Sequence, residues 1–389
     1  MGREITTGAY WFYRRQFDNA GMNMRILLRD RIDGGLLQAA ALRVMERFPF
    51  LKFTCEKSGD NTQYLLTENS RPFSVAERSG FVRFDDPVSN GYLWTLSCRE
   101  NRLYLRLFHG LSDGLGLMSV ARALLCAYFS ALTGTPLPQA ADPLSYADPF
   151  DYARPCSETF SFSVPEPFLT APERDGASHR HLITLSLREV LDVSRQTEGS
   201  VSGILSLLLA RALERRNRDP RKTVVVKCPL NLRPMLGCTE TLQNCVSSVH
   251  YVYSEKLARL PFPQQASCFK GMLMIQSAEE FQMNRFLAWK QDVLRFNRST
   301  TIEEKRAMLN TADGVFPMVS YLGRFSVGEY DRFLSGADVT LDLGGGIGMI
   351  TLAIGDRLSM SLLTSEADRS FVRDLTGELD ELGISYTIE

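Results

Sequence analysis

The sequence predicts an α+β protein made of two similar halves, each an open mixed β-sheet sandwiched with helices. Three observations lead to this fold class. Strand-like and helix-like segments alternate without the strict strand–helix–strand rhythm of a parallel α/β protein. Eight of the 17 prolines fall between residues 136 and 172, in a stretch without sustained periodicity that predicts a long connection. A chain of 389 residues is long enough for two domains. We therefore expect an N-terminal half (1–135), a proline-rich linker (136–178) and a C-terminal half (179–389).

The N-terminal half alternates short apolar segments with two helical patterns. Strands are expected at Met24–Arg31, Phe50–Glu56, Gln63–Thr67, Tyr92–Cys98 and Arg102–Phe108. The last two strands form a hairpin that turns at Glu100 and Asn101, and leucines occupy every second position of its second strand, which predicts one aliphatic face. Helices are expected at Gly35–Arg47 and Leu115–Leu132, because apolar residues recur there at helical spacing.

The C-terminal half is similar in style but not in sequence. Strands are expected at His181–Ser186, Thr223–Pro229, Cys245–Tyr253, Met318–Leu322, Asp338–Asp342, Ile347–Ile354 and Leu358–Leu363. Helices are expected at Leu187–Gln196, Val201–Arg216, Gln264–Phe296, Ile302–Asn310 and Ala367–Leu382. Helices again cluster between strands, which favours an open mixed sheet in this half too.

Composition excludes several classes of protein. The net charge is −1, so nothing draws the whole chain toward nucleic acid or anionic lipid. The eight cysteines have no zinc-ligand or disulfide-framework spacing and are expected to be free thiols in a reducing cytosol. With only four histidines, a multi-histidine metal site is not expected, and we assign no metal ligands. We see no signal peptide and no apolar run approaching 18 residues, and predict a cytoplasmic protein without membrane insertion.

The strongest chemical signal is His109-Gly-Leu-Ser-Asp113-Gly114, which lies where a strand ends and a helix begins. A histidine at such a turn can project into a cleft. The start of the helix directs free backbone N–H groups and a positive dipole end toward it, which disfavours imidazolium and keeps His109 a neutral base. The N–H of Gly114 is free to bind a developing oxyanion. Asp113 has two possible roles, either to orient His109 or to anchor the structure by pairing with an arginine.

This His-x-x-x-Asp-Gly motif, before an amphipathic helix, resembles that of the acyltransferases related to chloramphenicol acetyltransferase. That superfamily includes condensation domains of peptide synthetases, alcohol O-acetyltransferases and polyketide-associated acyltransferases, and the last two groups look most similar. Three later segments also resemble the superfamily: Pro229–Pro234, Leu242–Ser248 and Ser320–Phe325.

The resemblance implies two halves with a tunnel between them and a thioester donor. It implies that His109 is the general base, with Asp113 and Gly114 completing the catalytic motif. It also implies that Asp113 forms a salt bridge with an arginine, for which Arg233 is the best match. The remaining residues of the matching segments are expected along the substrate channel: Ser112, Asn231, Ser247, Ser248 and Tyr321.

Two departures from the superfamily narrow the expected reaction. Condensation domains usually carry a second histidine directly before the motif, where this chain has Phe108, so an alcohol acceptor is favoured over an amine. The superfamily also includes the plant BAHD acyltransferases, and their Asp-Phe-Gly-Trp-Gly signature is absent from this chain, so a plant-type enzyme is not expected. We expect a monomeric O-acyltransferase that uses acyl-coenzyme A or an acyl-carrier protein as co-substrate and binds no cofactor. The alternatives are a catalytically silent interaction module and an amide-forming condensation enzyme that works with a carrier protein in trans.

Other signals are weaker. The glycine run 343–348 lacks the last glycine of a dinucleotide-binding motif and precedes a strand, so a glycine-rich loop is expected. The basic run from Arg215 to Lys222 could meet coenzyme A phosphates or an acidic carrier protein, but a solvated helix end is the simpler interpretation. His179 and His181 are expected near the surface, and His250 in a core or edge position.

Overall fold

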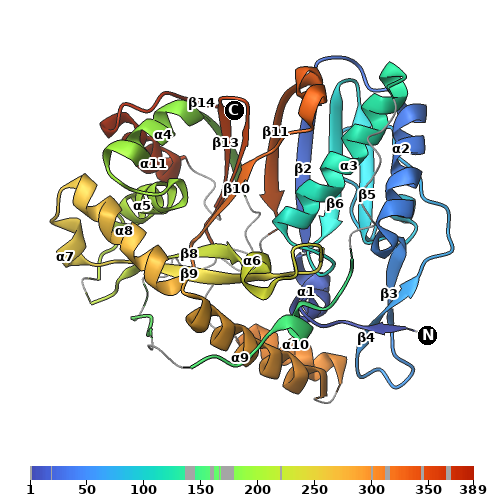
Figure 1. Ribbon diagram of the computed structural model, residues 1–389, viewed down its shortest axis with the longest axis horizontal. Coiled ribbons are helices and arrows are strands. Elements are labelled where there is room, and N and C mark those ends of the chain that lie inside the picture. Colours follow the sequence, from blue (N-terminus) through green and yellow to red (C-terminus); the bar gives the residue numbers. More distant parts are fainter. Residues whose placement is uncertain are drawn as a thin grey trace.

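The computed structural model describes residues 2–18, 20–135, 145–157, 162–165, 167, 179–219, 221–298, 301–311, 316–342, 346–364 and 369–389. These residues form three β-sheets with helices packed around them (Figure 1). The expected α+β class with open sheets is confirmed. Most of the expected linker and residues 343–345 of the glycine run lie outside the described residues.

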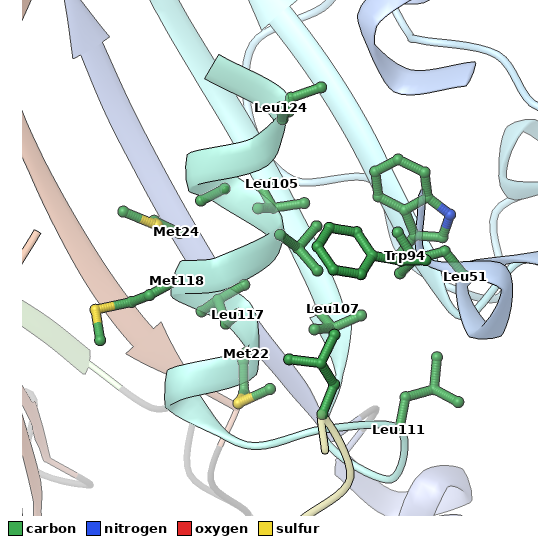
Figure 2. Close-up of a cluster of buried hydrophobic side chains, with 14 of the residues drawn as sticks. Met22, Met24, Leu51, Trp94, Leu105, Leu107, Leu111, Leu117, Met118 and Leu124 are labelled. Carbon is green, nitrogen blue, oxygen red and sulfur yellow. The ribbon is translucent and has the colours of Figure 1, made fainter. Parts of the chain in front are cut away.

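A four-stranded antiparallel sheet, in the order β11-β2-β6-β5, forms the centre of the N-terminal half. Its strands are β2 (Gly21–Leu28), β5 (Trp94–Arg99), β6 (Arg102–Phe108) and β11 (Leu334–Leu341). Helices α2 (Gly34–Arg47) and α3 (Gly114–Thr133) share one hydrophobic core with it. Figure 2 shows side chains of α3, including Leu117, Met118 and Leu124, packed with side chains of these strands. The expected aliphatic face of β6 is therefore the face that meets the helices.

Strand β11 reaches this sheet from the far end of the sequence. It pairs antiparallel with β2 from Leu334 opposite Leu28 to Leu341 opposite Met22. The chain leaves the seven-stranded sheet after Arg324, contributes β11 to the N-terminal sheet, and then returns (Figure 1). The expected division of the chain at residues 136–178 stays a prediction, but the sheets do not follow it strictly.

A three-stranded sheet and helix α1 also belong to the N-terminal half. The sheet has the order β1-β4-β3, with β1 (Arg3–Glu4), β3 (Phe53–Lys57) and β4 (Tyr64–Glu68). Helix α1 (Ala9–Asp18) was not foreseen from the sequence. Five of its ten residues are aromatic, and aromatic residues are enriched in strands, so its composition hides its helical character.

The C-terminal half is built on a seven-stranded mixed sheet in the order β14-β7-β13-β12-β10-β8-β9. Its strands are β7 (His179–Ser186), β8 (Val224–Asn231), β9 (Val246–Tyr253), β10 (Met318–Arg324), β12 (Gly348–Ile354), β13 (Arg357–Thr364) and β14 (Tyr386–Ile388). Strand β10 runs parallel to β8 and β12, and the other pairs are antiparallel. A second hydrophobic core joins the sheet to α4 (Leu187–Gln196), α5 (Val201–Glu214), α8 (Phe262–Gln276) and α11 (Ser370–Glu381).

The remaining elements connect these layers. They are α6 (Arg233–Leu236), α7 (Glu255–Ala258), α9 (Glu279–Arg298), α10 (Ile302–Thr311) and four short 3-10 turns, η1 (Pro49–Lys52), η2 (Pro87–Ser89), η3 (Pro149–Tyr152) and η4 (Gly328–Phe333). The single helix expected over Gln264–Phe296 is wrong, because α8 ends at Gln276 and α9 begins at Glu279. At this break the Gln276 side chain is held by β9, where it accepts from the His250 N–H and donates to the His250 carbonyl. The strand expected from Phe50 begins at Phe53, because Pro49 starts the η1 turn.

Helix α3 is the one described helix that is long and apolar enough to cross a bilayer, with a mean hydropathy of 1.7 over its most apolar window. That window is 67% buried inside the protein. Burial of this kind is typical of a core helix, as Figure 2 illustrates. The cytoplasmic localisation stays a prediction.

Candidate active site

His109 lies directly after the last residue of β6, and α3 begins five residues later. Its backbone is held from two sides: the His109 N–H donates to the Ala20 carbonyl over 2.9 Å, and the Asn244 side chain donates to the His109 carbonyl over 2.7 Å. Two glycines make room for the N-terminal segment here. A Cβ at Gly8 would lie 1.9 Å from the Gly110 carbonyl oxygen, and a Cβ at Gly110 would overlap the rings of Phe12 and Phe108. Residues 109–113, called the histidine loop below, are therefore tightly fixed.

The hydrogen bonds of the imidazole assign its tautomer. Nδ1 of His109 lies 3.0 Å from the Ser112 carbonyl oxygen, and a carbonyl can only accept, so Nδ1 carries the proton. Nε2 then presents a lone pair, as a general base requires. The ring stacks on Trp11 with a centroid separation of 4.2 Å and an interplanar angle of 11°, and it stays partly exposed. Burial is the main cause that lowers the pKa of His109 from 6.5, although the Asp113 charge opposes this. The imidazole is therefore a neutral base at physiological pH.

Asp113 serves as the N-cap of α3, and its described hydrogen bonds and ion pair are with groups other than the imidazole. Its Oδ1 accepts from the N–H groups of Leu115 and Gly116, each over 3.2 Å. Its Oδ2 accepts from the Cys245 N–H over 3.0 Å and lies 2.9 Å from Nη1 of Arg233. Of the two roles that the sequence leaves open for Asp113, this geometry favours the structural anchor.

The buried guanidinium of Arg233 joins three segments. Besides Asp113, it donates to the carbonyls of Thr241 and Gln243, each over 2.8 Å, and to Oδ1 of Asn231 over 3.2 Å. The ion pair is almost completely buried, with 6% of the Arg233 side chain and 2% of the Asp113 side chain exposed. The structure thus brings Arg233 and Asp113 together and places Asn231 as a residue that orients the arginine.

Gly114 and Gly116 open α3 and are needed as glycines for different reasons. A Cβ at Gly114 would lie 2.6 Å from Cδ2 of Leu322 on β10, so this glycine permits contact between the halves. A Cβ at Gly116 would lie 1.8 Å from Oγ of Ser112. In the first turn of α3, Asp113 accepts from residues 115, 116 and 117. Among the described residues, nothing accepts from the Gly114 N–H, so this donor is left free at the start of α3.

The four other expected channel residues have different environments. Ser112 is fully buried and its hydroxyl donates to the Leu242 carbonyl, which favours a role in holding the loop over contact with substrate. Tyr321 packs against the second core and, by strand alternation, lies on the opposite face of β10 from Leu322. Ser248 contacts Arg285 of α9, and Ser247 points to the other face of β9. Of these four residues, Ser112 contacts His109, through its backbone carbonyl, whereas the described contacts of Ser247, Ser248 and Tyr321 do not include His109.

Several residues at the site were not singled out from the sequence. Trp11 and Asn244 contact His109 directly, and Gln243 accepts from the hydroxyls of Thr6 and Thr7. Tyr146, in the described part of the expected linker, donates from its hydroxyl to the Leu111 carbonyl over 3.0 Å. The linker thus supports the histidine loop. An isolated Trp or Asn carries no spacing signal, so only long-range packing reveals these contacts.

The weaker signals have structural explanations. Arg211 of α5 and the two arginines that follow this helix, Arg215 and Arg216, pair with acidic residues of α11. The start of the basic run therefore stabilises helix packing. His181 and His250 are both buried, which corrects the expected surface position of His181. Among the described residues, no group of three or more His, Cys, Asp or Glu side chains could hold a metal ion.

Solved structures resemble this fold closely, whereas no protein-family model and no curated protein sequence matches the chain. TRI3 trichothecene 15-O-acetyltransferase from Fusarium sporotrichioides has a TM-score of 0.67 and 10% identity, covering 98% of this chain and 94% of that chain. TRI101 from F. sporotrichioides, complexed with coenzyme A and T-2, has a TM-score of 0.63 and 11% identity, covering 97% and 98%. The epimerization domain from the third module of tyrocidine synthetase B has a TM-score of 0.66 and 15% identity, covering 98% and 96%. These similarities confirm the expected superfamily resemblance at the level of the fold.

Proposed function

We propose that this protein transfers an acyl group from a thioester, either acyl-coenzyme A or an acyl-carrier protein, to an alcohol, with His109 as the general base. The observation that carries the proposal is that Nδ1 of His109 and both carboxylate oxygens of Asp113 already have partners within the protein. Nδ1 of His109 is held by the Ser112 carbonyl, and Asp113 is used by the helix N-terminus, Cys245 and Arg233. Nε2 is therefore the basic atom available to an acceptor.

The reaction follows from these positions. Nε2 of His109 takes the proton of the acceptor hydroxyl as its oxygen attacks the thioester carbonyl carbon. The negative charge on the former carbonyl oxygen is stabilised by the Gly114 N–H at the positive end of α3. The C–S bond then breaks, the proton on Nε2 passes to the leaving thiolate, and an ester and a free thiol result. A thioester is already activated, so no nucleophilic side chain is required.

Two alternatives to acyl transfer to an alcohol are amide formation and a catalytically silent interaction module. The similar structures include an O-acetyltransferase, a protein complexed with coenzyme A and an epimerization domain, so the fold alone does not select the reaction. Phe108 precedes His109 where condensation domains usually carry a second histidine, and this favours an alcohol over an amine. A silent interaction module would have no need for the unshared Nε2 of His109 or for the pKa that keeps it neutral.

The test is thiol release from acyl-coenzyme A and acyl-pantetheine thioesters of increasing chain length, each offered with a panel of alcohols and amines. We expect ester formation with at least one alcohol, and we expect His109→Ala to lower it by about 10²–10⁴-fold. Amide formation alone would support the condensation alternative. Thiol release that survives undiminished in His109→Ala would disprove the mechanism.

A further inference from the structure

Arg285 of α9 is a half-buried cation without an acidic partner among the described residues. Its Nη1 donates to the Ser248 carbonyl over 2.9 Å, and its Nη2 to Oγ of Ser248 over 3.4 Å. Burial lowers the pKa of Arg285, and no carboxylate opposes this. Several other buried or half-buried arginines have a carboxylate partner: Arg25, Arg106, Arg211 and Arg233. The Arg285 guanidinium also lies over the Phe281 ring, 5.5 Å from the centroid. These described contacts are with uncharged groups, and a desolvated cation in such surroundings is suited to an incoming anion.

Two further buried polar atoms beside Arg285 have no partner. His250 lies two residues beyond Ser248 on the same face of β9, is 8% exposed, and its Nδ1 makes no hydrogen bond. The Oε1 of Gln282 is also buried without a partner. Burial first, and then the charges of Arg285 and Lys227, lower the pKa of His250 to about 4, so the surroundings of the ring are positive. Unpartnered buried polar atoms are rare in folded proteins and call for an explanation such as a ligand.

This cluster lies within reach of a substrate bound at His109. Asn244 contacts the His109 carbonyl and Cys245 contacts Asp113, and β9 begins at the next residue. With a rise of about 3.3 Å per residue, Ser248 is about 10 Å and His250 about 17 Å along the strand from Cys245. Arg285 retains partial exposure, so its guanidinium remains accessible.

We propose that Arg285, Ser248 and His250 form a binding site for an anionic group, a carboxylate or a phosphate, at the end of a chain-like substrate whose reacting end lies at His109. The proposal rests on the acyl transfer proposed above and specifies its substrate class. The fork of the guanidinium matches the paired oxygens of either anion, and an imidazole N–H adds a third donor. The anion could belong to the donor, as the phosphate of a phosphopantetheine arm, or to the acyl chain, as a terminal carboxylate.

Calorimetric titration of the full chain with two matched pairs of probes tests the site. The first pair is phosphopantetheine and pantetheine, and the second is an acyl-pantetheine thioester that ends in a carboxylate and one of equal length that ends in a methyl group. We expect at least tenfold tighter binding of the anionic member of one pair, and that pair identifies the source. Arg285→Leu should remove this preference and leave the neutral member within about twofold. Equal binding of both members in both pairs by the wild type would overturn the proposal.

Control variants separate charge at the site from charge elsewhere. Arg295→Leu removes an exposed arginine of the same helix that pairs with Asp292, and it should leave the preference intact. Arg285→Lys keeps the charge and should retain part of the preference. His250→Phe keeps the ring contact with Phe316, at 5.4 Å, and should weaken the anionic probe about threefold or more. A preference that Arg295→Leu abolishes as completely as Arg285→Leu would contradict the assignment.

Failure of the site and failure of the proposed reaction give different results. If the Arg285-dependent preference is measured but no thioester is turned over with any acceptor, the anion site is supported and the proposed acyl transfer is disproved. If esters form in a His109-dependent manner without any preference for an anionic probe, the acyl transfer is supported and the anion site is disproved.

Discussion

Replacing Asp113 by asparagine tests whether this carboxylate holds the structure or acts on His109. Asparagine keeps the shape and one acceptor oxygen, so the cap on Leu115 and Gly116 can persist. Its amide nitrogen then faces two donors, the Cys245 N–H and Nη1 of Arg233. The substitution therefore leaves a buried guanidinium without its counter-charge.

The expected loss of stability follows from these contacts. Removing one partner of a buried ion pair costs about 3–5 kcal/mol. The lower end applies here, because Arg233 keeps its bonds to Thr241, Gln243 and Asn231. For 389 residues unfolding as one unit, with about 2.1 cal/mol/K of unfolding entropy per residue, 3 kcal/mol lowers Tm by about 4 °C.

Calorimetry and thiol release on the same preparations provide the assay. Asp113→Asn should lose stability and rate together, whereas His109→Ala should lose rate with a Tm change of about 1 °C, since one hydrogen bond of the ring is lost. A double-mutant cycle with Arg233→Met should show a strong coupling. An Asp113→Asn variant that keeps the wild-type Tm but loses its rate would refute the anchor role and indicate direct action on His109.

Three other predictions concern the residues around the base. Because burial lowers the pKa of His109 from 6.5, the rate with a neutral acceptor should fall as the pH falls, with its half-maximal value below pH 6.5. A half-maximal value above pH 6.5 would contradict a neutral imidazole. Gly116→Ala should displace the Ser112 hydroxyl from the Leu242 carbonyl and lower both Tm and rate. Adding Ser112→Ala should restore part of both, because the overlapping atom is Oγ of Ser112. No recovery in the double variant would show that this clash is not the cause. Trp11→Ala removes the ring stacked on His109, so kcat should fall about 10–100-fold and the acid limb of the pH profile should move toward pH 6.5. Trp11→Phe should keep most of the rate. A pH profile that Trp11→Ala leaves unshifted would mean that Trp11 does not shield the base from water.

The local chemistry of the site was largely visible in the sequence. The strand that ends at Phe108 and the helix after Asp113 follow from periodicity, and together they place His109 at a turn. The burial of Ser112 was not visible, because it depends on the close approach of Gly116 and Leu242. The same holds for Trp11, whose helix is masked by aromatic composition and whose contact with His109 joins residues 98 positions apart.

Long-range topology was the least predictable part of the fold. Strand β11 has apolar residues at every second position from Ala337 to Leu341, although both of its faces are buried there. Nothing in this pattern predicts β2 as its neighbour. The break between α8 and α9 depends on Gln276 bonding to β9, a contact between elements that periodicity cannot express. Such pairings are set by the packing of the whole chain rather than by propensity.

The excursion of β11 into the N-terminal sheet has a consequence for biosynthesis. About 310 residues separate the end of β2 from the end of β11, so at roughly 5–20 residues per second a ribosome needs about 15–60 s to supply the missing neighbour. During that time the edge of β2, with Met22, Met24 and Ile26 among its side chains, has no partner strand and resembles the edges that seed aggregation. We therefore expect a fragment that stops before residue 334 to be insoluble.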